Sequence, residues 1–488
     1  MNNTNTNITH ETKFTMKVIE HSQVAPPPNS LTSPTILPLT FFDIPWFYCH
    51  PIQRIFFYHF PHPTHHFLQT TLPILKHSLS ITLLHFFPFS SNLIVPPNSQ
   101  NTDPYIRYLD EDSISFTVAE SSADFNILVS DSQDAQNWHH LVPNLPPPRT
   151  EQDNTRIIPI MAIQVTVLPN SGLSICLSYN HVAADGKSLH HFVKFWASLS
   201  KAIAKNNNNL SLEYSPPLDL PSHERDRVKD PNGLKLVYLQ ELEDSESNEM
   251  EFAGLVRDSY VNKIRTALVL SYEQVQKLKK WVTDKCKESC RIQHLSTFVV
   301  TSSLIWFCMI KAEEGDSKSD EGDCVDLDDH CYFVFLADCR DSGELSLPKT
   351  YFGNCLASYT VAVKRDELIG KNGIVSASIG IEKKIRHLKS HALLGAETLM
   401  SDYREMSKPG KSVTVVAGSP KLAVYETDFG WGKPKKSDAV HLDSSGSISL
   451  SDCRDGGGGI EVGLALERSR ITNFINIFQE QLDNICSM

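Results

Sequence analysis

The residues best suited to chemistry lie in the short stretch 180–186, which reads Asn-His-Val-Ala-Ala-Asp-Gly. Before it, apolar and polar residues alternate over residues 173–180, which is the period of a strand with one buried face. After it, apolar residues recur at helical spacing as far as Ile203. His181 therefore stands where a strand ends and a helix is about to begin. An imidazole in that position can reach into a cleft and act as a general base.

Asp185 follows His181 by four residues, in the pattern His-x-x-x-Asp-Gly. This spacing is weak by itself, because about one such pair is expected by chance in a chain with 20 histidines. On spacing alone, Asp185 could be the carboxylate of a catalytic triad behind the histidine.

A second stretch, Asp-Phe-Gly-Trp-Gly at 428–432, is followed by Lys433, Lys435 and Lys436. Its two glycines favour a role in backbone geometry over direct chemistry. The lysines could meet the phosphates of a ligand, although a lysine run is more often a solvated surface.

The composition is that of a soluble globular protein with two or more domains, since the 488 residues are 41% hydrophobic and 21% charged. The formal charge of -12 argues against general binding to nucleic acid or acidic membranes. No signal peptide is apparent at the N-terminus, and the least charged stretch, 292–310, is expected to be buried core rather than a membrane span. The 11 cysteines lack the spacing of a zinc site, which favours reduced thiols in the cytosol and no metal.

Strand and helix patterns are distributed along the chain. Strands are expected near 163–167, 263–270, 332–337, 413–417, 447–450 and 460–466, and helices near 68–83, 188–205, 272–287, 296–311 and 471–482. The aromatic cluster at 37–46 is interpreted as packing rather than pocket lining.

Asparagines at 206–209 and the prolines after them mark a crossing linker. The expected division is a disordered tail at 1–16, a first domain at 17–205, a linker at 206–235 and a second domain at 236–488. The acidic run 313–329 is expected to be a mobile surface loop.

Taken together and in this order, the stretches at 181–186 and 428–432 resemble the two signature motifs of the plant BAHD acyltransferases. The pair is far more specific than either motif alone. Tyr-Phe-Gly-Asn-Cys at 351–355 resembles the extra motif of the branch that acylates anthocyanins and other flavonoid glycosides. Residues 37–43 and 337–340 are also similar to that branch. The resemblance covers nearly the whole chain and departs from the family only at 221–227 and in the acidic run.

The resemblance implies an α/β fold of two domains like those of chloramphenicol acetyltransferase, with mixed sheets flanked by helices. The active-site channel would lie at the interface between the domains. His181 would be the general base of direct acyl transfer in a ternary complex. Asp185 would turn away from the imidazole and pair with Arg340.

The resemblance implies weaker expectations for other residues. The second motif would shape the channel as structural support, through Asp428, Gly430 and Gly432. Contacts with CoA are expected from Ser419, Trp431 and Lys433. Lys187 is a candidate partner for the carboxylate of a malonyl group.

The implied enzyme is a cytosolic monomer without bound cofactor or metal, and without nucleic-acid or membrane partners. It would use acyl-CoA as co-substrate and acylate a sugar hydroxyl of a flavonoid or other phenolic glucoside. Malonyl-CoA is the favoured donor, because the overall pattern is most similar to phenolic glucoside malonyltransferases. Two alternatives stay open: a hydroxycinnamoyl-CoA donor, and a non-catalytic relative that acts as a binding protein. Condensation domains of peptide synthetases share His-x-x-x-Asp-Gly, but the stretch 428–432 favours the acyltransferases.

Overall fold

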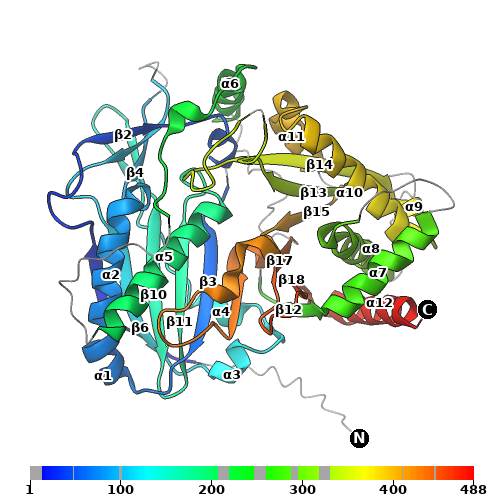
Figure 1. Cartoon of the computed structure of the whole chain (residues 1–488), viewed down its shortest axis with the longest axis horizontal. Helices are drawn as coiled ribbons and strands as arrows, with labels where there is room; N and C mark the ends of the chain where they lie inside the picture. The colour runs from blue at the N-terminus through cyan, green and yellow to red at the C-terminus, as the bar shows by residue number, and fades with distance from the viewer. Residues whose placement is uncertain are drawn as a thin grey trace, which may run out of the picture.

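The computed structural model describes residues 14–47, 49–97, 102–206, 219–246, 260–286, 295–317, 330–343, 345–408, 410–444 and 447–487. Within these residues the chain forms three β-sheets with helices packed against them (Figure 1). This arrangement confirms the α/β class expected from the sequence.

The first sheet is built mainly from the N-terminal part of the chain. Its strands, in spatial order, are β1 (Met16–Val24), β6 (Ile114–Ser121), β10 (Met161–Leu168), β11 (Gly172–Tyr179), β3 (Ile52–His59) and β16 (Lys436–Ala439). Strands β10 and β6 are parallel, and the other neighbours are antiparallel. Every residue of β10 and β11 is buried, as the central strands of a covered sheet require. Helices α2 (Leu72–His85) and α5 (Gly186–Lys205) lie side by side over this sheet (Figure 1).

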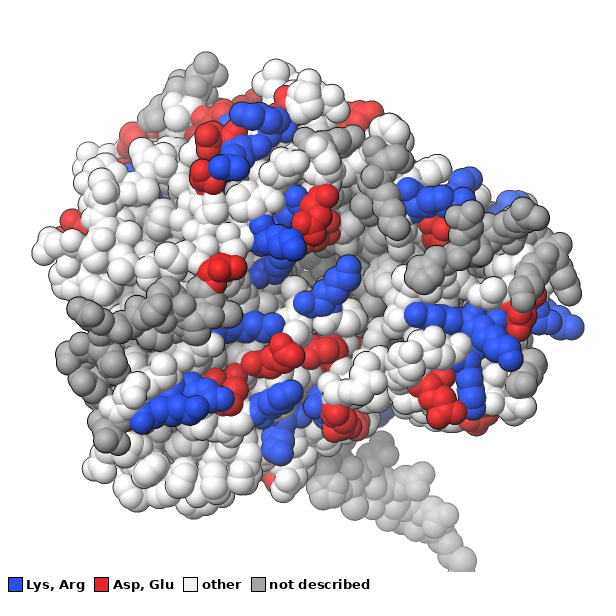
Figure 2. Space-filling model, in the orientation of Figure 1, with Lys and Arg blue, Asp and Glu red and all other residues white. Residues whose placement is uncertain are grey.

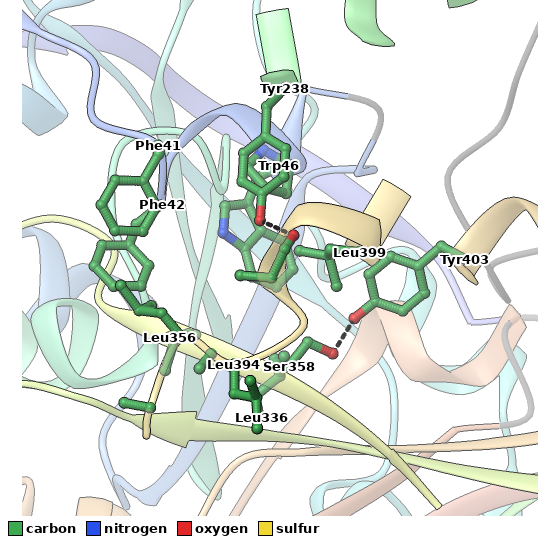
Figure 3. Close-up of a pocket in the computed structure, with 15 residues that line it drawn as sticks. Phe41, Phe42, Trp46, Tyr238, Leu336, Leu356, Ser358, Leu394, Leu399 and Tyr403 are labelled. Carbon is green, nitrogen blue, oxygen red and sulfur yellow. Dashed lines mark hydrogen bonds between the residues drawn. The ribbon is translucent and has the colours of Figure 1, made fainter. Parts of the chain in front are cut away.

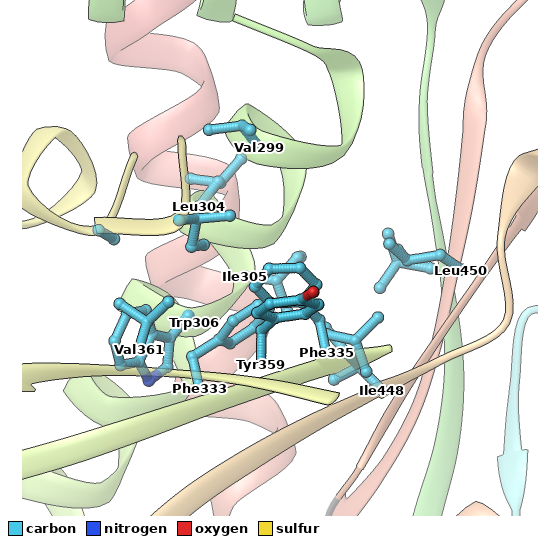
Figure 4. Close-up of a cluster of buried hydrophobic side chains, with 14 of the residues drawn as sticks. Val299, Leu304, Ile305, Trp306, Phe333, Phe335, Tyr359, Val361, Ile448 and Leu450 are labelled. Carbon is cyan, nitrogen blue, oxygen red and sulfur yellow. The ribbon is translucent and has the colours of Figure 1, made fainter. Parts of the chain in front are cut away.

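The second sheet is built mainly from the C-terminal part. Its strands are β14 (Leu356–Lys364), β13 (His330–Asp338), β15 (Ser412–Ala417), β17 (Ile448–Asp452), β18 (Ile460–Glu467), β12 (Lys263–Leu270) and β7 (Ser132–Asp134). Helix α8 (Thr297–Ser317) packs against α7 (Tyr272–Cys286), α10 (Gly373–Ser390) and α12 (Arg468–Cys486). Figure 4 shows side chains of α8, among them Trp306, beside Phe333 and Phe335 of β13 in the core of this half.

A third, antiparallel sheet and several short helices complete the described fold. The sheet contains β2 (Thr35–Pro38), β5 (Tyr105–Tyr108), β4 (Asn92–Val95), β9 (Arg156–Pro159) and β8 (Arg149–Thr150). The remaining α-helices are α1 (Thr64–His66), α3 (Phe125–Leu128), α4 (Gln136–His139), α6 (Leu234–Glu246), α9 (Arg365–Ile369) and α11 (Leu399–Met406).

The two large sheets exchange strands, which the sequence did not predict. Strand β16 comes from the C-terminal part and pairs with β3 of the first sheet. Strand β7 comes from the N-terminal part and pairs with β12 of the second sheet. Strands of three or four residues are too short for a period-two pattern to stand out, so periodicity could not reveal them.

Most of the longer expected elements are present. Strands β10 and β11 form the expected hairpin, and its turn places Asn170 at a φ of 62°. Helix α8 begins as expected, because the Ser296 hydroxyl accepts a hydrogen bond from the Val299 amide at 3.2 Å. None of the described helices has the length and apolar composition needed to cross a membrane.

Two boundary predictions were wrong. Glu313 was assigned to the mobile acidic loop but lies on α8, where Arg365 and Arg470 both pair with it. Met16 was assigned to the disordered tail but opens β1, because that strand extends to pair with Ser121. The rest of the tail up to residue 13, residues 207–218 of the expected linker and residues 318–329 of the acidic run lie outside the described residues.

Candidate active site

His181 is held at the junction of the two large sheets. Strand β11 ends at Tyr179, and the chain turns sharply because the Asn180 side chain accepts a hydrogen bond from the Val182 amide at 3.0 Å. The turn leaves His181 only 6% exposed. The residues facing it across the junction, 353–355, directly precede β14 of the second sheet.

Asp185 caps helix α5 and points away from the imidazole. One of its carboxylate oxygens accepts a hydrogen bond from the Ser188 amide at 2.9 Å, and the other accepts one from the Cys355 amide at 3.1 Å. The second oxygen also lies 2.8 Å from Nη2 of Arg340, and both side chains are fully buried. The ion pair expected between Asp185 and Arg340 is therefore present.

Arg340 extends this ion pair into a network that fixes the 351–355 segment. Its guanidinium donates to the backbone oxygens of Tyr351 and Gly353 at 3.1 Å each, and to the Ser188 hydroxyl at 3.2 Å. Burial alone would lower the pKa of Arg340, but the charges of Asp185 and Asp338 raise it, so the guanidinium stays charged. The start of α5 is thereby locked to the second half of the chain.

Asn354 fixes which nitrogen of the imidazole carries the proton. Its amide nitrogen donates to the backbone oxygens of His181 and Val182 at 2.9 and 3.1 Å, and to a carboxylate oxygen of Asp43 at 2.9 Å. Three acceptors on that side orient the amide, so its oxygen faces Nδ1 of His181 at 3.1 Å. Because an amide oxygen only accepts, Nδ1 carries the hydrogen and Nε2 carries the lone pair. Among the described residues, the hydrogen bond to Asn354 is the one found for the His181 ring, and it uses Nδ1 rather than Nε2.

The imidazole of His181 is neutral at pH 7. Burial lowers the pKa of His181 to about 4, although hydrogen bonds, including the one to Asn354, and the charge of Asp185 act in the opposite direction. A neutral His181 could accept a proton at Nε2 without first losing one. The carboxylates of Asp185 and Asp43 would stabilise the cation that forms when Nε2 takes a proton.

The aromatic cluster at 37–46 belongs to the site, so its interpretation as packing alone was wrong. The Trp46 indole stacks on His181 with ring centroids 3.7 Å apart and planes 9° from parallel. Asp43 is fully buried, and Nη1 of Arg225 pairs with it at 2.6 Å. Trp46 therefore covers one face of the imidazole, and Asp43 holds the Asn354 amide that bonds to its edge.

Sequence reasoning had noted the segments that contain Asp43, Trp46 and Asn354, but not their roles at the imidazole. Arg225, in the expected linker, was missed altogether. An acidic residue inside an apolar run was the available signal for Asp43, since a buried carboxylate must find partners.

A cavity lies behind Trp46. It is small and lies between the 41–46 segment, α6, the start of β14 and the segment that leads into α11. Figure 3 shows Phe42, Trp46, Tyr238 and Tyr403 around it. The side chains that line it are mainly apolar.

The second motif forms a loop braced by Asp428. This carboxylate accepts hydrogen bonds from the amides of Gly430 and Gly432 at 2.7 and 2.9 Å, and Lys201 of α5 pairs with it at 2.5 Å. Both glycines have positive φ angles, 111° and 94°, which other residues rarely adopt. Lys201 is 15 residues beyond Gly186 on α5, about 20 Å along the helix axis. This geometry favours structural support over chemistry for the motif.

The expected CoA contacts lie in accessible or partly accessible places. Ser419 caps the short helix Pro420–Leu422, and Trp431 packs against Tyr58 and Phe60 near the end of β3. Lys433 is exposed. Lys436 is buried between Asp131 and Glu461, which leaves it unsuited to a CoA phosphate. Figure 2 shows basic and acidic side chains interspersed on the visible face rather than gathered into one basic surface.

Two cations could meet an acyl carboxylate. Lys187 is already paired with Asp338 at 2.8 Å. Arg54 on β3 is 6% exposed, and neither its Nε nor its Nη2 has a hydrogen-bond partner among the described residues. These two nitrogens share one edge of the guanidinium, the edge that binds a carboxylate through two parallel bonds.

The comparisons with known proteins cover nearly the whole chain. The Transferase family model matches residues 15–481. Coumaroyl-CoA:anthocyanidin 3-O-glucoside-6''-O-coumaroyltransferase 1 of Arabidopsis thaliana is 38% identical, over 95% of this chain and 97% of its own length. The malonyl-coenzyme:anthocyanin 5-O-glucoside-6'''-O-malonyltransferase of Salvia splendens is 34% identical, over 96% of each chain.

The fold is shared with solved structures as well. The crystal structure of vinorine synthase aligns with a TM-score of 0.63 at 18% identity, covering 94% of this chain and 96% of that one. The family model and the relatives span nearly the whole sequence, including both motifs. The chain therefore belongs to the Transferase family, the BAHD acyltransferases.

Proposed function

We propose that the protein transfers an acyl group from acyl-CoA to a sugar hydroxyl of a flavonoid or other phenolic glucoside. The observation that carries this proposal is the imidazole of His181, whose Nδ1 is held by Asn354 and whose Nε2 has no hydrogen-bond partner among the described residues. The aromatic cavity behind Trp46 and the names of the two reported relatives support the substrate class.

The reaction follows from the position of the lone pair. Nε2 of His181 takes the proton of the sugar hydroxyl as its oxygen attacks the thioester carbonyl. The tetrahedral intermediate collapses by breaking the carbon–sulfur bond, and the imidazolium returns the proton to the departing thiolate. The products are an ester and free CoA, and no acyl-enzyme forms.

Malonyl-CoA is the donor we propose. A malonyl group carries a carboxylate that needs a cation in a water-poor channel. The guanidinium edge formed by Nε and Nη2 of Arg54 suits this role better than Lys187, because these nitrogens have no hydrogen-bond partner among the described residues, whereas Nζ of Lys187 already bonds to Asp338.

A hydroxycinnamoyl-CoA donor is the second candidate. The cavity lined by Phe41, Phe42 and Trp46 supports it, because an apolar, aromatic space suits a phenylpropanoid ring. The coumaroyltransferase relative supports it as well.

The remaining assignments belong to the same proposal. The base acts between a first domain at 17–205 and a second domain at 236–488, in a cytosolic monomer without a bound cofactor or metal. Structural support comes from Asp185, Arg340, Asp428, Gly430 and Gly432. Ser419, Trp431 and Lys433 contact CoA.

The experiment is a donor-by-acceptor assay read by mass spectrometry. Purified protein is offered malonyl-CoA or p-coumaroyl-CoA with a flavonoid 7-O-glucoside, beside the variant His181→Ala. A glucoside ester that forms with wild type and is lost in the variant supports the proposal. A preference for p-coumaroyl-CoA would overturn the malonyl assignment alone. If no donor yields an ester, the non-catalytic alternative replaces the enzyme.

A further inference from the structure

Asp43 is surrounded by hydrogen-bond donors. The side chain is fully buried, and its Oδ2 atom accepts from the amide and the hydroxyl of Thr40 at 2.8 Å each and from Nη1 of Arg225 at 2.6 Å. Its Oδ1 atom accepts from the backbone amide and the side-chain amide of Asn354 at 3.3 and 2.9 Å. An ionised carboxylate accepts on both oxygens, whereas a protonated acid or an amide would turn a donor toward one of these donors. The arrangement therefore suits a charged Asp43.

Arg225 supplies the opposite charge. It begins the short helix Arg225–Arg227, in the segment that joins the two halves, and is only 5% exposed. Burial alone would lower the pKa of Arg225, but the charge of Asp43 raises it, so the guanidinium stays charged. A buried carboxylate that lost such a cation would be left with an uncompensated charge, which is strongly unfavourable. The charge of Asp43 thus depends on Arg225.

The segment that carries Arg225 is attached to the residues that precede Asn354. The Phe352 amide donates a hydrogen bond to the backbone oxygen of Ser222 at 2.8 Å. A Cβ atom at Gly353 would come within 3.0 Å of the Arg225 guanidinium, so the backbone passes close to this cation. Arg225 is thereby fixed against the segment that ends at Asn354.

A relay of contacts leads from Arg225 to the base. Arg225 bonds to one carboxylate oxygen of Asp43, and the other oxygen holds the Asn354 amide. The oxygen of that amide faces Nδ1 of His181 at 3.1 Å. An amide in place of the carboxylate would keep its oxygen toward Arg225 and Thr40, which supply three donors, and would turn its NH₂ group toward Asn354. The Asn354 amide would then be pushed away from the imidazole.

We propose that Asp43, kept charged by Arg225, is a positioning residue for the general base. Its carboxylate holds the Asn354 amide in the orientation that leaves the lone pair of His181 on Nε2. The tautomer of the imidazole is thus set from the segment that joins the two halves of the chain. This inference rests on the proposed function, because it concerns the base of that reaction.

Two variants and a matched control test the relay. Asp43→Asn removes the charge at nearly unchanged size. Asp43→Asn combined with Arg225→Met removes the cation as well, so that the new amide can turn its oxygen the other way. Asp112→Asn is the control, because this partly buried carboxylate also accepts from a backbone amide and an asparagine side chain, those of Leu109 and Asn92, at 2.7 Å each.

The tautomer of His181 is the decisive readout, and nitrogen NMR measures it without acyl transfer. The histidine rings are labelled with ¹⁵N, and the signals of His181 are identified by their absence from His181→Ala. We expect the hydrogen on Nδ1 in nearly all molecules of wild type and Asp112→Asn, a mixture in Asp43→Asn, and a return toward wild type in the double variant. A single Nδ1 tautomer in folded Asp43→Asn overturns the role of Asp43. A double variant no closer to wild type than Asp43→Asn overturns the role of Arg225.

Steady-state kinetics test the consequence for the reaction. We expect Asp43→Asn to lower kcat about fivefold, like Asn354→Ala, because both changes release Nδ1 of His181. KM for both substrates should stay within about twofold, since Asp43 lies behind Asn354 and not at Nε2. An unchanged kcat, or a rise in KM alone, rejects the positioning role.

Melting temperatures show which variants keep the fold. If Asp43→Asn does not fold, Asp43→Leu with Arg225→Met takes its place, because this pair leaves no buried charge unpaired. The same mixture of tautomers and the same fall in kcat are then expected, and their absence overturns the inference.

Failure of acyl transfer and failure of the relay give different results. If no donor yields an ester, the proposed reaction is rejected, while the tautomers of wild type and Asp43→Asn still decide the relay. If the ester forms and Asp43→Asn keeps a single tautomer, the relay alone is rejected.

Discussion

At the scale of single residues, the orientation and the protonation state of the His181 imidazole are both set by its surroundings. Asn354 holds Nδ1, Trp46 covers one face, and burial lowers the pKa to about 4. When the ring is neutral and its tautomer is fixed, the lone pair is on Nε2 in every molecule. Without this fixation, some molecules would carry the proton on Nε2 and could not accept one there. Neither of these partners lies next to His181 in the sequence, so local patterns could mark His181 as a candidate base but not show how its ring is oriented.

Replacement of His181 by Ala should remove most of the activity but should hardly change the stability of the fold. We expect kcat/KM to fall by about 10²- to 10⁴-fold, the usual contribution of a general base, with the melting temperature nearly kept. His140→Ala is the matched control, because burial also lowers the pKa of His140 to about 4. A His181→Ala enzyme of wild-type activity would refute the assignment of the base.

Without the Asn354 amide, the hydrogen of the His181 ring should no longer be held on Nδ1. Asn354→Ala is expected to lower kcat about fivefold, since one hydrogen bond to His181 is worth about 1 kcal/mol. The buried Asn137, changed to Ala, controls for loss of an amide elsewhere. An unchanged kcat in folded Asn354→Ala would remove this residue from the positioning of His181.

The pH profile of the wild type provides a further check. Because the pKa of His181 is lowered to about 4, the base stays neutral above that pH. The acid limb of kcat/KM should therefore lie well below the pH of about 6.5 at which an ordinary histidine titrates. If the acid limb lies near pH 6.5 and persists when each of the other histidines is replaced, the pKa of His181 is not lowered and the prediction is wrong.

At the scale of elements, the start of α5 is where sequence and structure agree best. A strand, a His-x-x-x-Asp-Gly turn and an amphipathic helix were predicted from local patterns, and β11 and α5 follow that order. The direction in which Asp185 points was not available from those patterns. It depends on Arg340, which is distant in the sequence and becomes a neighbour only through tertiary packing.

Asp185→Ala should therefore damage the fold as well as the activity. Removing one partner of a fully buried ion pair typically costs about 3–5 kcal/mol. We expect a clear drop in melting temperature and yield, in contrast to His181→Ala. The double variant Asp185→Asn with Arg340→Met should regain part of that stability, because no charge is left unpaired. Equal melting of the Asp185→Ala and His181→Ala proteins would reject this structural role.

At the scale of the whole molecule, the exchanged strand β16 ties the two sheets together through a buried carboxylate. Asp438 of β16 accepts hydrogen bonds from Arg265 of β12 at 2.7 Å and from the Ser449 hydroxyl of β17 at 2.6 Å. Gly463 on β18 makes room for it, since a Cβ atom there would come within 2.2 Å of the carboxylate. No local pattern marks such a contact, because its partners come from three separate strands. The sequence therefore predicted two halves but not how they are joined.

The junction should make stability depend on pH in a defined direction. Burial alone would raise the pKa of Asp438, but the charges of Arg265 and Arg54 dominate and lower it below that of an unfolded aspartate, about 3.9. A carboxyl with a lowered folded pKa stabilises the native state above pH 3.9, and this contribution disappears as the pH falls through the folded pKa.

Asp438→Ala should accordingly lose about 3–5 kcal/mol of unfolding free energy at pH 7, measured by urea unfolding. The exposed Asp483, changed to Ala, is the control. The difference from wild type should shrink as the pH falls below about 4. A deficit that stays constant down to pH 3 would mean that lost packing, and not the charge of Asp438, joins the two sheets.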